Sequence, residues 1–391
     1  MALTDKLSAI GTAIREKTGK TDLMTLDQMP AEIAAIETGG SGDEGIPEEV
    51  LVITGNCTSR FAYNGWNWFI EKYGDKITTN NISGAGNMFQ TADQLIEIPF
   101  DINLSGTYLA NGFNGCLKLL TVPRINILNP NDTKAYSMNS LFNGCRRLRD
   151  AENAFDAENL NMLANFKPSS AYSSHQLNDM FSFCYSLRKV PSWFSKLRVS
   201  EESTVYPAAS QYVYYSAFQQ CYVLDEILNI PVLRCAAGMQ TSNMFYNTFD
   251  SCRRVKNITF ETQEDGTPYT VNGWNNQTID LTNYVGYVYT AENTMYMYSD
   301  ITEDDKVDSE ATYEAKKNTE NWYAYPATYS RYNHDSAVAT INSLPDVSSG
   351  SSNIIKFQGK CGELTDGGAI NTLTEEEIAV ATAKGWTVSL V

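Results

Sequence analysis

The sequence predicts a repeat solenoid that is mainly β with short helices, flanked by a small N-terminal helical module and a C-terminal helix-strand cap. An apolar formula, F-x-x-[CA]-x-x-[LV]-x-x-[IVA], recurs six times between Phe89 and Ile258. Its cysteine or alanine positions are 24, 29, 39, 37 and 31 residues apart. Such periods are typical of arrays in which each unit buries its apolar face only by stacking on its neighbours.

The repeated positions are predicted to form one continuous core. The first copy carries Phe89, Ala92 and Leu95 at these positions. The other five copies contribute a phenylalanine, a cysteine and a leucine or valine each: Phe113, Cys116, Leu119, Phe142, Cys145, Leu148, Phe181, Cys184, Leu187, Phe218, Cys221, Leu224, Phe249, Cys252 and Val255.

Residues 1–36 are predicted to be a helical attachment or oligomerisation module. One helix face has the 4-3-4 spacing of two heptads and consists of Leu3, Leu7, Ile10 and Ile14. Two heptads are too short to be stable alone, so this face needs residues 25–36 or further copies as a partner. We therefore expect a homo-oligomer, specifically a trimer. Residues 37–48, rich in glycine, serine and acid, are predicted to be a flexible linker.

The remaining chain divides into three parts. Residues 49–80, with a strand-like LVITG and an aromatic segment with a helical tail, are predicted to cap the array. Residues 81–265 form the predicted solenoid, whose insertions at 161–176 and 201–216 are expected to be loops on one face. Residues 266–391 are predicted to hold further strands, loops and the C-terminal cap.

The C-terminal cap has the clearest local signals. Thr374 and Glu377 have the spacing of a capping box, and an amphipathic helix follows to Ala383. Gly385 is expected to end that helix, and WTVSLV has the composition of a strand.

Composition limits the classes of partner. The 391 residues carry a net charge of −17, which argues against a nucleic-acid backbone or an anionic membrane as partner. No apolar stretch resembles a signal peptide or approaches the length of a membrane span. We therefore expect folding in a cytosol and no membrane insertion.

The eight cysteines are predicted to be reduced and structural. Five occupy the same place in successive copies, and no C-x-x-C spacing indicates a metal site. A small apolar thiol suits a buried stack. We expect no metal and no cofactor.

Catalysis has no positive signal in the sequence. The two histidines, His175 and His334, are far apart, and no nucleophile elbow or glycine-rich nucleotide loop is present. We expect no enzymatic activity and assign no catalytic residues. A pair of carboxylates that cleaves glycosides is spatial rather than sequential, so a polysaccharide depolymerase stays open as a lesser alternative.

Binding is favoured by the 23 tyrosines. Tyrosine offers a rigid apolar face and a hydroxyl at low entropic cost, which suits recognition of sugars or protein loops. Some tyrosines, such as Tyr287 and Tyr289, alternate as a packed strand face would. The aromatic residues expected in loops are the binding candidates: Tyr212, Tyr214, Tyr215, Trp322, Tyr323, Tyr325 and Tyr329.

The repeat phrase, which ends in proline at Pro99, Pro123 and Pro191, resembles the irregular leucine-rich repeats of BspA-like surface proteins. The N-terminal LTDKLSAIGTAIREKTGKTDLMTLDQMPAEIAAI and the late TDGGAINTLTEEEIAVATAKGWTV are similar to modules of bacteriophage tail, baseplate and fibre proteins. Ala92 and Ala151 depart from the repeat pattern, so the resemblance implies no ligand-binding residues.

This resemblance implies a virion protein that is assembled in the host cytoplasm. Its N-terminal module would bind other virion proteins, and its repeats would bind a glycan or protein of the host cell surface. The alternative is purely architectural, such as a head fibre or a capsid decoration protein. A bacterial adhesin would require an export signal, which we do not find.

Overall fold

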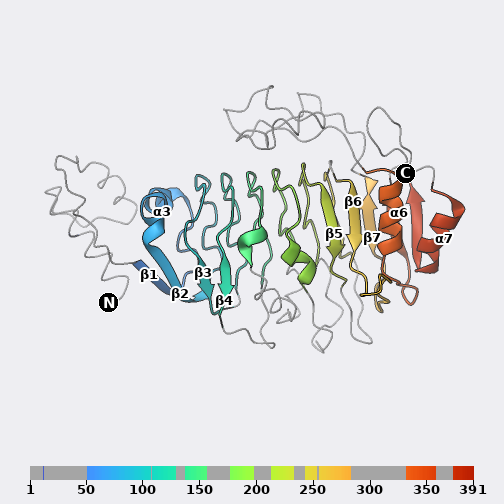
Figure 1. Cartoon of the computed structure of the whole chain (residues 1–391), viewed down its shortest axis with the longest axis horizontal. Coiled ribbons are helices and arrows are strands. Elements are labelled where there is room, and N and C mark those ends of the chain that lie inside the picture. The colour runs from blue at the N-terminus through green and yellow to red at the C-terminus, as the bar shows by residue number, and fades with distance from the viewer. Residues whose placement is uncertain are drawn as a thin grey trace, which may run out of the picture.

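The computed structural model describes residue 12 and the ranges 51–106, 108–128, 137–155, 177–197, 213–232, 243–252, 255–282, 332–357 and 373–391. From residue 51 onward the described residues form an elongated body, along which the elements follow one another in chain order (Figure 1). Apart from Thr12, which is helical and exposed, the predicted module 1–36 and linker 37–48 lie outside the described residues.

All strand pairs of the three small sheets are parallel. The sheet orders are β1-β2-β3-β4, β5-β6 and β7-β8-β9. The strands are β1 (Leu51–Asn56), β2 (Ile77–Gly84), β3 (Ile102–Leu104), β4 (Ile125–Ile127), β5 (Glu226–Ile230), β6 (Asn257–Phe260), β7 (Thr278–Leu281), β8 (Asn353–Phe357) and β9 (Trp386–Leu390).

Short helices connect or replace the strands. The α-helices are α3 (Asn67–Tyr73), α6 (His334–Ser343) and α7 (Glu375–Ala383). The 3-10 helices are η1 (Asn64–Trp66), η2 (Gly74–Lys76), η3 (Glu152–Ala154) and η4 (Ser192–Lys196). In the copies of Phe142 and Phe181, η3 and η4 stand where the earlier copies have β3 and β4. Trp193 of η4 is fully buried there and donates from Nε1 to the carbonyl of Ala151 at 2.8 Å.

Each copy contains a segment that hydrogen bonds to the same segment of the next copy, and we call it a turn row. A turn row runs from five residues before the repeat phenylalanine to three after it. The residues two before, at and two after the phenylalanine donate their N–H groups to the following row; Ser59, Phe61 and Tyr63, for example, donate to Gly86, Met88 and Gln90. The rows centre on Phe61, Phe89, Phe113, Phe142, Phe181, Phe218 and Phe249.

The backbone of every turn row has the same alternation of left- and right-handed residues. The position two before the phenylalanine has φ between 51° and 57° in all seven rows, and the position two after it has φ between 58° and 76°. Serine, asparagine or aspartate fills the first of these positions every time: Ser59, Asn87, Asn111, Ser140, Asp179, Ser216 and Asn247. Short polar side chains tolerate the left-handed region better than most residues, which explains this selection.

Stacked rings and thiols fill the interior below the turn rows. From Phe61 to Phe218 the repeat phenylalanines stack with centroids 5.4 to 5.9 Å apart. Each repeat cysteine donates its S–H to the backbone carbonyl of the repeat phenylalanine in the preceding copy, as Cys184 does to Phe142 at 3.1 Å. Burial raises the pKa of the Cys145, Cys184 and Cys252 thiols well above their ordinary value. These buried thiols are therefore neutral and unreactive in the fold.

The stack of rows begins one unit earlier than the six-copy alignment. Phe61 lies in the predicted cap 49–80, yet its ring stacks on Phe89 at 5.4 Å and its row bonds to the next. The formula does not recognise this row because Asn64 stands where the other rows have cysteine or alanine. The row of Phe61 therefore belongs to the stack of turn rows and also forms its N-terminal end.

The C-terminal elements form the other end of the body (Figure 1). The predicted capping box of α7 is present, with Thr374 and Glu377 bonded to each other's backbone N–H. Helix α6, which we did not predict, packs against β6: Thr340 Oγ1 donates to the carbonyl of Ile258 at 2.6 Å, and Ser343 Oγ accepts from Phe260 N at 3.0 Å. Its signal in the sequence is a second capping box, formed by Asn333 and Ser336.

Candidate functional site

The predicted site residues fall into three groups. All fifteen repeat residues proposed as core are buried. Tyr214 and Tyr215 are described, whereas the remaining binding candidates lie outside the described residues: Tyr212, Trp322, Tyr323, Tyr325 and Tyr329. The predicted oligomerisation face also lies outside them: Leu3, Leu7, Ile10 and Ile14.

Tyr214 is not an exposed binding residue, so our assignment of it to a recognition loop is wrong. Its side chain is 1% exposed, its ring stacks on Phe245 at 5.4 Å, and its hydroxyl donates to the carbonyl of Pro231 at 2.6 Å. The segment from residue 213 onward belongs to the turn row of Phe218 rather than to the preceding insertion. In that row Tyr214 stands four residues before Phe218 and points inward. Tyr215 stands three residues before Phe218 and points outward.

Tyr215 forms an exposed aromatic pair with Tyr246. Both tyrosines stand three residues before the phenylalanine of their rows, and their rings stack with centroids 5.3 Å apart. Tyr246 is 54% exposed, while Tyr215 is half-buried. Tyr215 covers one face of the Tyr246 ring, and 54% of the Tyr246 side chain remains accessible. The pair offers one stacking surface with a polar rim.

A second aromatic group lies after the phenylalanines of neighbouring rows. The rings of Tyr185 and Tyr222 stack at 4.7 Å, and the guanidinium of Arg146 lies 5.6 Å from the Tyr185 ring. The Tyr222 hydroxyl donates to Oε1 of Gln220 at 2.8 Å. Cation–π contact and stacking hold Arg146, Tyr185 and Tyr222 in one line across three rows. We call these three residues the Tyr185 line.

Phe183 extends this second group at a cost in backbone energy. It occupies the left-handed position two after the repeat phenylalanine, with φ of 60°, where two earlier rows have Gly115 and Gly144. For a bulky residue this conformation costs about 1–2 kcal/mol. The Phe183 ring lies half-buried against Tyr185, at 6.5 Å. Positive φ at this position recurs in all seven rows, so it belongs to the geometry of the turn row, and Tyr185 itself is buried at 8% exposure.

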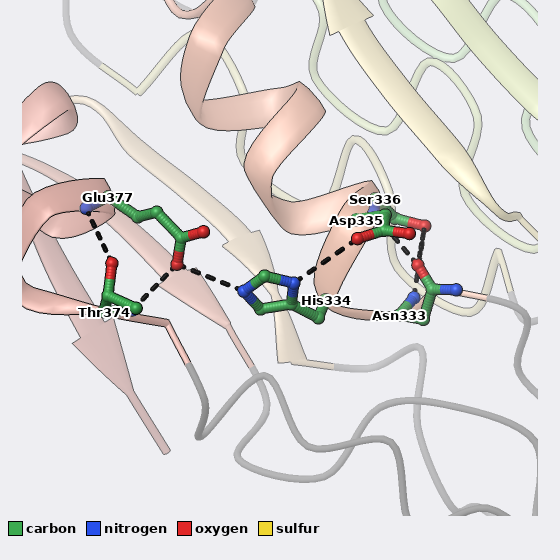
Figure 2. Close-up of polar contacts among 6 residues, drawn as sticks. All are labelled: Asn333, His334, Asp335, Ser336, Thr374 and Glu377. Atoms are coloured by element: carbon green, nitrogen blue, oxygen red, sulfur yellow. Dashed lines mark hydrogen bonds and ion pairs between the residues drawn. The ribbon is translucent and has the colours of Figure 1, made fainter.

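A cluster of polar side chains joins α6 to α7 (Figure 2). His334 Nε2 lies 3.1 Å from Glu377 Oε2, and His334 Nδ1 lies 3.4 Å from Asp335 Oδ1. Hydrogen bonding to Glu377 raises the pKa of His334, despite an opposing effect of burial. The pKa of Glu377 is lowered, first by the N–H of Thr374 and further by His334.

This cluster has the parts of a clamp rather than of a catalytic site. Glu377 Oε2 also accepts from Thr374 N at 2.8 Å and so completes the capping box of α7. The nearby hydroxyl of Ser336 bonds to Asn333 within the capping box of α6. Both helix starts are therefore tied together through one imidazole.

The clamp predicts a pH dependence of stability. Its histidine contribution should be complete below the ordinary pKa of 6.5 and should disappear as pH rises through the raised folded pKa. The Glu377 contribution has the opposite sign, since it is present above the ordinary pKa of 4.5 and is lost as pH falls through the lowered one. Wild type should therefore melt at a higher temperature than His334→Gln, and this difference in melting temperature should be larger near pH 6 than near pH 8.5. An equal difference at both pH values would contradict the clamp.

Two further observations bear on the site. Among the described residues, three or more His, Cys, Asp or Glu side chains never come together as a group that could hold a metal ion. Within the same residues, none of the helices has the length and apolar character needed to cross a membrane.

Comparison with protein-family models, with curated proteins and with solved structures finds no match to this chain. The site therefore has to be judged from its own chemistry. Sequence reasoning missed Tyr246, Tyr185 and Tyr222. Tyr246 stands three residues before its repeat phenylalanine, and Tyr185 and Tyr222 stand four after theirs, which can be read once the rows are aligned.

Proposed function

We propose that the chain is a non-enzymatic virion structural protein of a bacteriophage, which displays a leucine-rich-repeat solenoid for binding to the host surface. The observation that carries this proposal is the exposed Tyr215–Tyr246 pair, held on turn rows that are hydrogen bonded to one another. Backbone bonds from the row of Phe218 to the row of Phe249 fix these side chains before a ligand arrives. Pre-organised aromatic residues lose little entropy on binding, so they suit recognition.

The proposed ligand is a glycan or a protein loop of the host cell. An apolar ring or a sugar face would stack on the accessible face of Tyr246. Polar groups of the ligand would meet the side chains of Gln219 and Asp250, which bond to each other at 3.0 Å on the rows of Phe218 and Phe249. The N-terminal module, residues 1–36, is the proposed attachment to other virion proteins.

Replacing Tyr246 tests the proposal. Tyr246→Ala should weaken binding to host cells by about thirtyfold or more, since loss of an anchoring aromatic costs about 2 kcal/mol or more. Its melting temperature should stay close to wild type because the ring is 54% exposed. Binding of labelled protein to host cells, measured per folded molecule, gives the comparison.

Two variants serve as controls. Tyr108→Ala removes a tyrosine that is 44% exposed on another row and should leave binding unchanged. Tyr214→Ala removes a buried ring and should lower the melting temperature instead. If Tyr246→Ala binds host cells as well as wild type does, the architectural alternative, a head fibre or capsid decoration protein, is favoured.

A further inference from the structure

Strands β1 and β9 lie near opposite ends of the elongated body, where α3 and α7 also lie (Figure 1). In the described part of the chain, β1 pairs only with β2, and β9 pairs only with β8. The outer side of such a strand carries N–H and C=O groups that can pair with a further strand. The unpaired side of β9 could therefore pair with the unpaired side of β1 in another molecule.

Neither edge strand has the usual protection against pairing. Edge strands are commonly blunted by lysine or other charges, by proline or by bulges. The strands LVITGN and WTVSL contain no charged residue and no proline, although 19% of the chain is charged. The pairing of β1 becomes irregular only at Gly55, which leaves Leu51–Thr54 regular.

Exposed apolar side chains gather at the same two ends. Large hydrophobic residues that are well exposed number nine in the described residues. Five of them belong to the two end units, namely Val52, Tyr63, Val380, Leu390 and Val391. Val52 on β1 is 49% exposed and Leu390 on β9 is 41% exposed, so each edge offers an apolar side chain to a partner strand.

The ends also differ in charge. In residues 51–76, the three cations Arg60, Lys72 and Lys76 outnumber the two anions Glu71 and Asp75, which gives +1. In residues 373–391, three glutamates of α7 face one cation, Lys384, which gives −2. Over these two ranges the end with β1 is less acidic than the end with β9, in a chain of net charge −17.

We propose that β9 of one molecule adds to β1 of a second molecule, so that copies associate head to tail. Every strand pair in the body is parallel, so a shift along its long axis places β9 beside β1 in the sense that β8 and β9 already have. Such a contact uses two different surfaces and does not close on itself, so it forms linear assemblies. The occupant of each edge is a second copy of this chain, independent of any host ligand.

The contact should be weak and should strengthen with salt. It joins two short strands, which belongs with small transient interfaces, and we expect association at about 10–100 µM protein. Two bodies of charge −17 repel each other at long range. Added salt screens this repulsion more than it affects backbone pairing, so association should increase with salt.

Sedimentation of the full chain over a concentration series, at low and high salt, tests the proposal. The sedimentation coefficient of wild type should rise with protein concentration as larger assemblies form. Val52→Lys and Leu390→Lys, each measured alone, should show no such rise. An equimolar mixture of the two variants should form pairs and nothing larger, since the intact β9 of Val52→Lys can meet the intact β1 of Leu390→Lys only once. Leu228→Lys, a control at a 39% exposed position far from both ends, should behave as wild type.

Several outcomes overturn the proposal. They are a wild type that does not grow at any salt concentration, a mixture of variants that forms no pairs, and growth by either variant alone. Loss of growth in Val52→Lys without loss in Leu390→Lys would indicate pairing of two β1 strands instead. Melting temperatures verify folding, and Thr54→Lys and Thr387→Lys, exposed on the same strands, replace any variant that unfolds.

Discussion

Phe181→Ala should lower the free energy of unfolding by about 3–5 kcal/mol, which is typical for removing a buried aromatic ring. The Phe181 side chain has no exposed area and stacks between Phe142 at 5.4 Å and Phe218 at 5.9 Å. The ring also contacts Trp193 and Phe194 of η4. Backbone bonds between the rows keep them apart, so the cavity cannot collapse, and the cost should be in the upper part of this range.

Urea unfolding followed by circular dichroism and tryptophan fluorescence measures this effect. Phe183→Ala is the matched control, because it removes the same ring two residues later, where the side chain is half-buried. We expect the control to cost less than about 1.5 kcal/mol, since partial burial stabilises in proportion to area. Equal losses for the two variants would show that the stack of phenylalanines is not the core of the array.

Asn353→Leu should cost about 2–6 kcal/mol, because it removes two buried hydrogen bonds to backbone groups, at about 1–3 kcal/mol each. Asn353 Oδ1 accepts from Gln277 N at 3.0 Å, and its Nδ2 donates to the carbonyl of Trp274 at 3.0 Å. Its side chain is 1% exposed. Leucine has a similar volume, so the loss reports the hydrogen bonds that join the start of β8 to the segment before β7.

The corresponding control is Asn342→Leu, an identical change at an exposed position of α6. It should alter the unfolding free energy by less than about 0.5 kcal/mol, as exposed substitutions usually do. Thermal melts of both variants provide the comparison. A melting temperature for Asn353→Leu equal to that of wild type would mean that Gln277 and Trp274 find other partners.

Local patterns in the sequence predict local features of the fold well. The phenylalanine, cysteine or alanine, and leucine or valine positions of the formula are all buried, because an apolar side chain repeated at one place in each unit must face the same side. The capping box of Thr374 and Glu377 depends on residues three apart and forms as predicted. Helix α6 was missed because its box uses Asn333 and Ser336, a less familiar pair.

The candidate site was less predictable, because adjacent tyrosines have opposite environments. Tyr214 and Tyr215 are neighbours of identical type, yet one is buried under Phe245 and the other pairs with Tyr246 at the surface. Their directions follow from the alternating backbone of the turn row, which is set by hydrogen bonds to the rows on each side. Composition and clustering alone cannot separate the two residues.

The sequence by itself determined which positions repeat, which of them are apolar and where α7 begins, since these properties depend on spacing within short segments. The tertiary structure decided which aromatic residues reach the surface, that His334 meets Glu377 across 43 residues, and that uncharged strands lie at both ends. Each of these depends on which segments become neighbours when the rows stack. That pairing is a property of the whole chain, because the hydrogen bonds and burial that select it come from residues far apart in sequence.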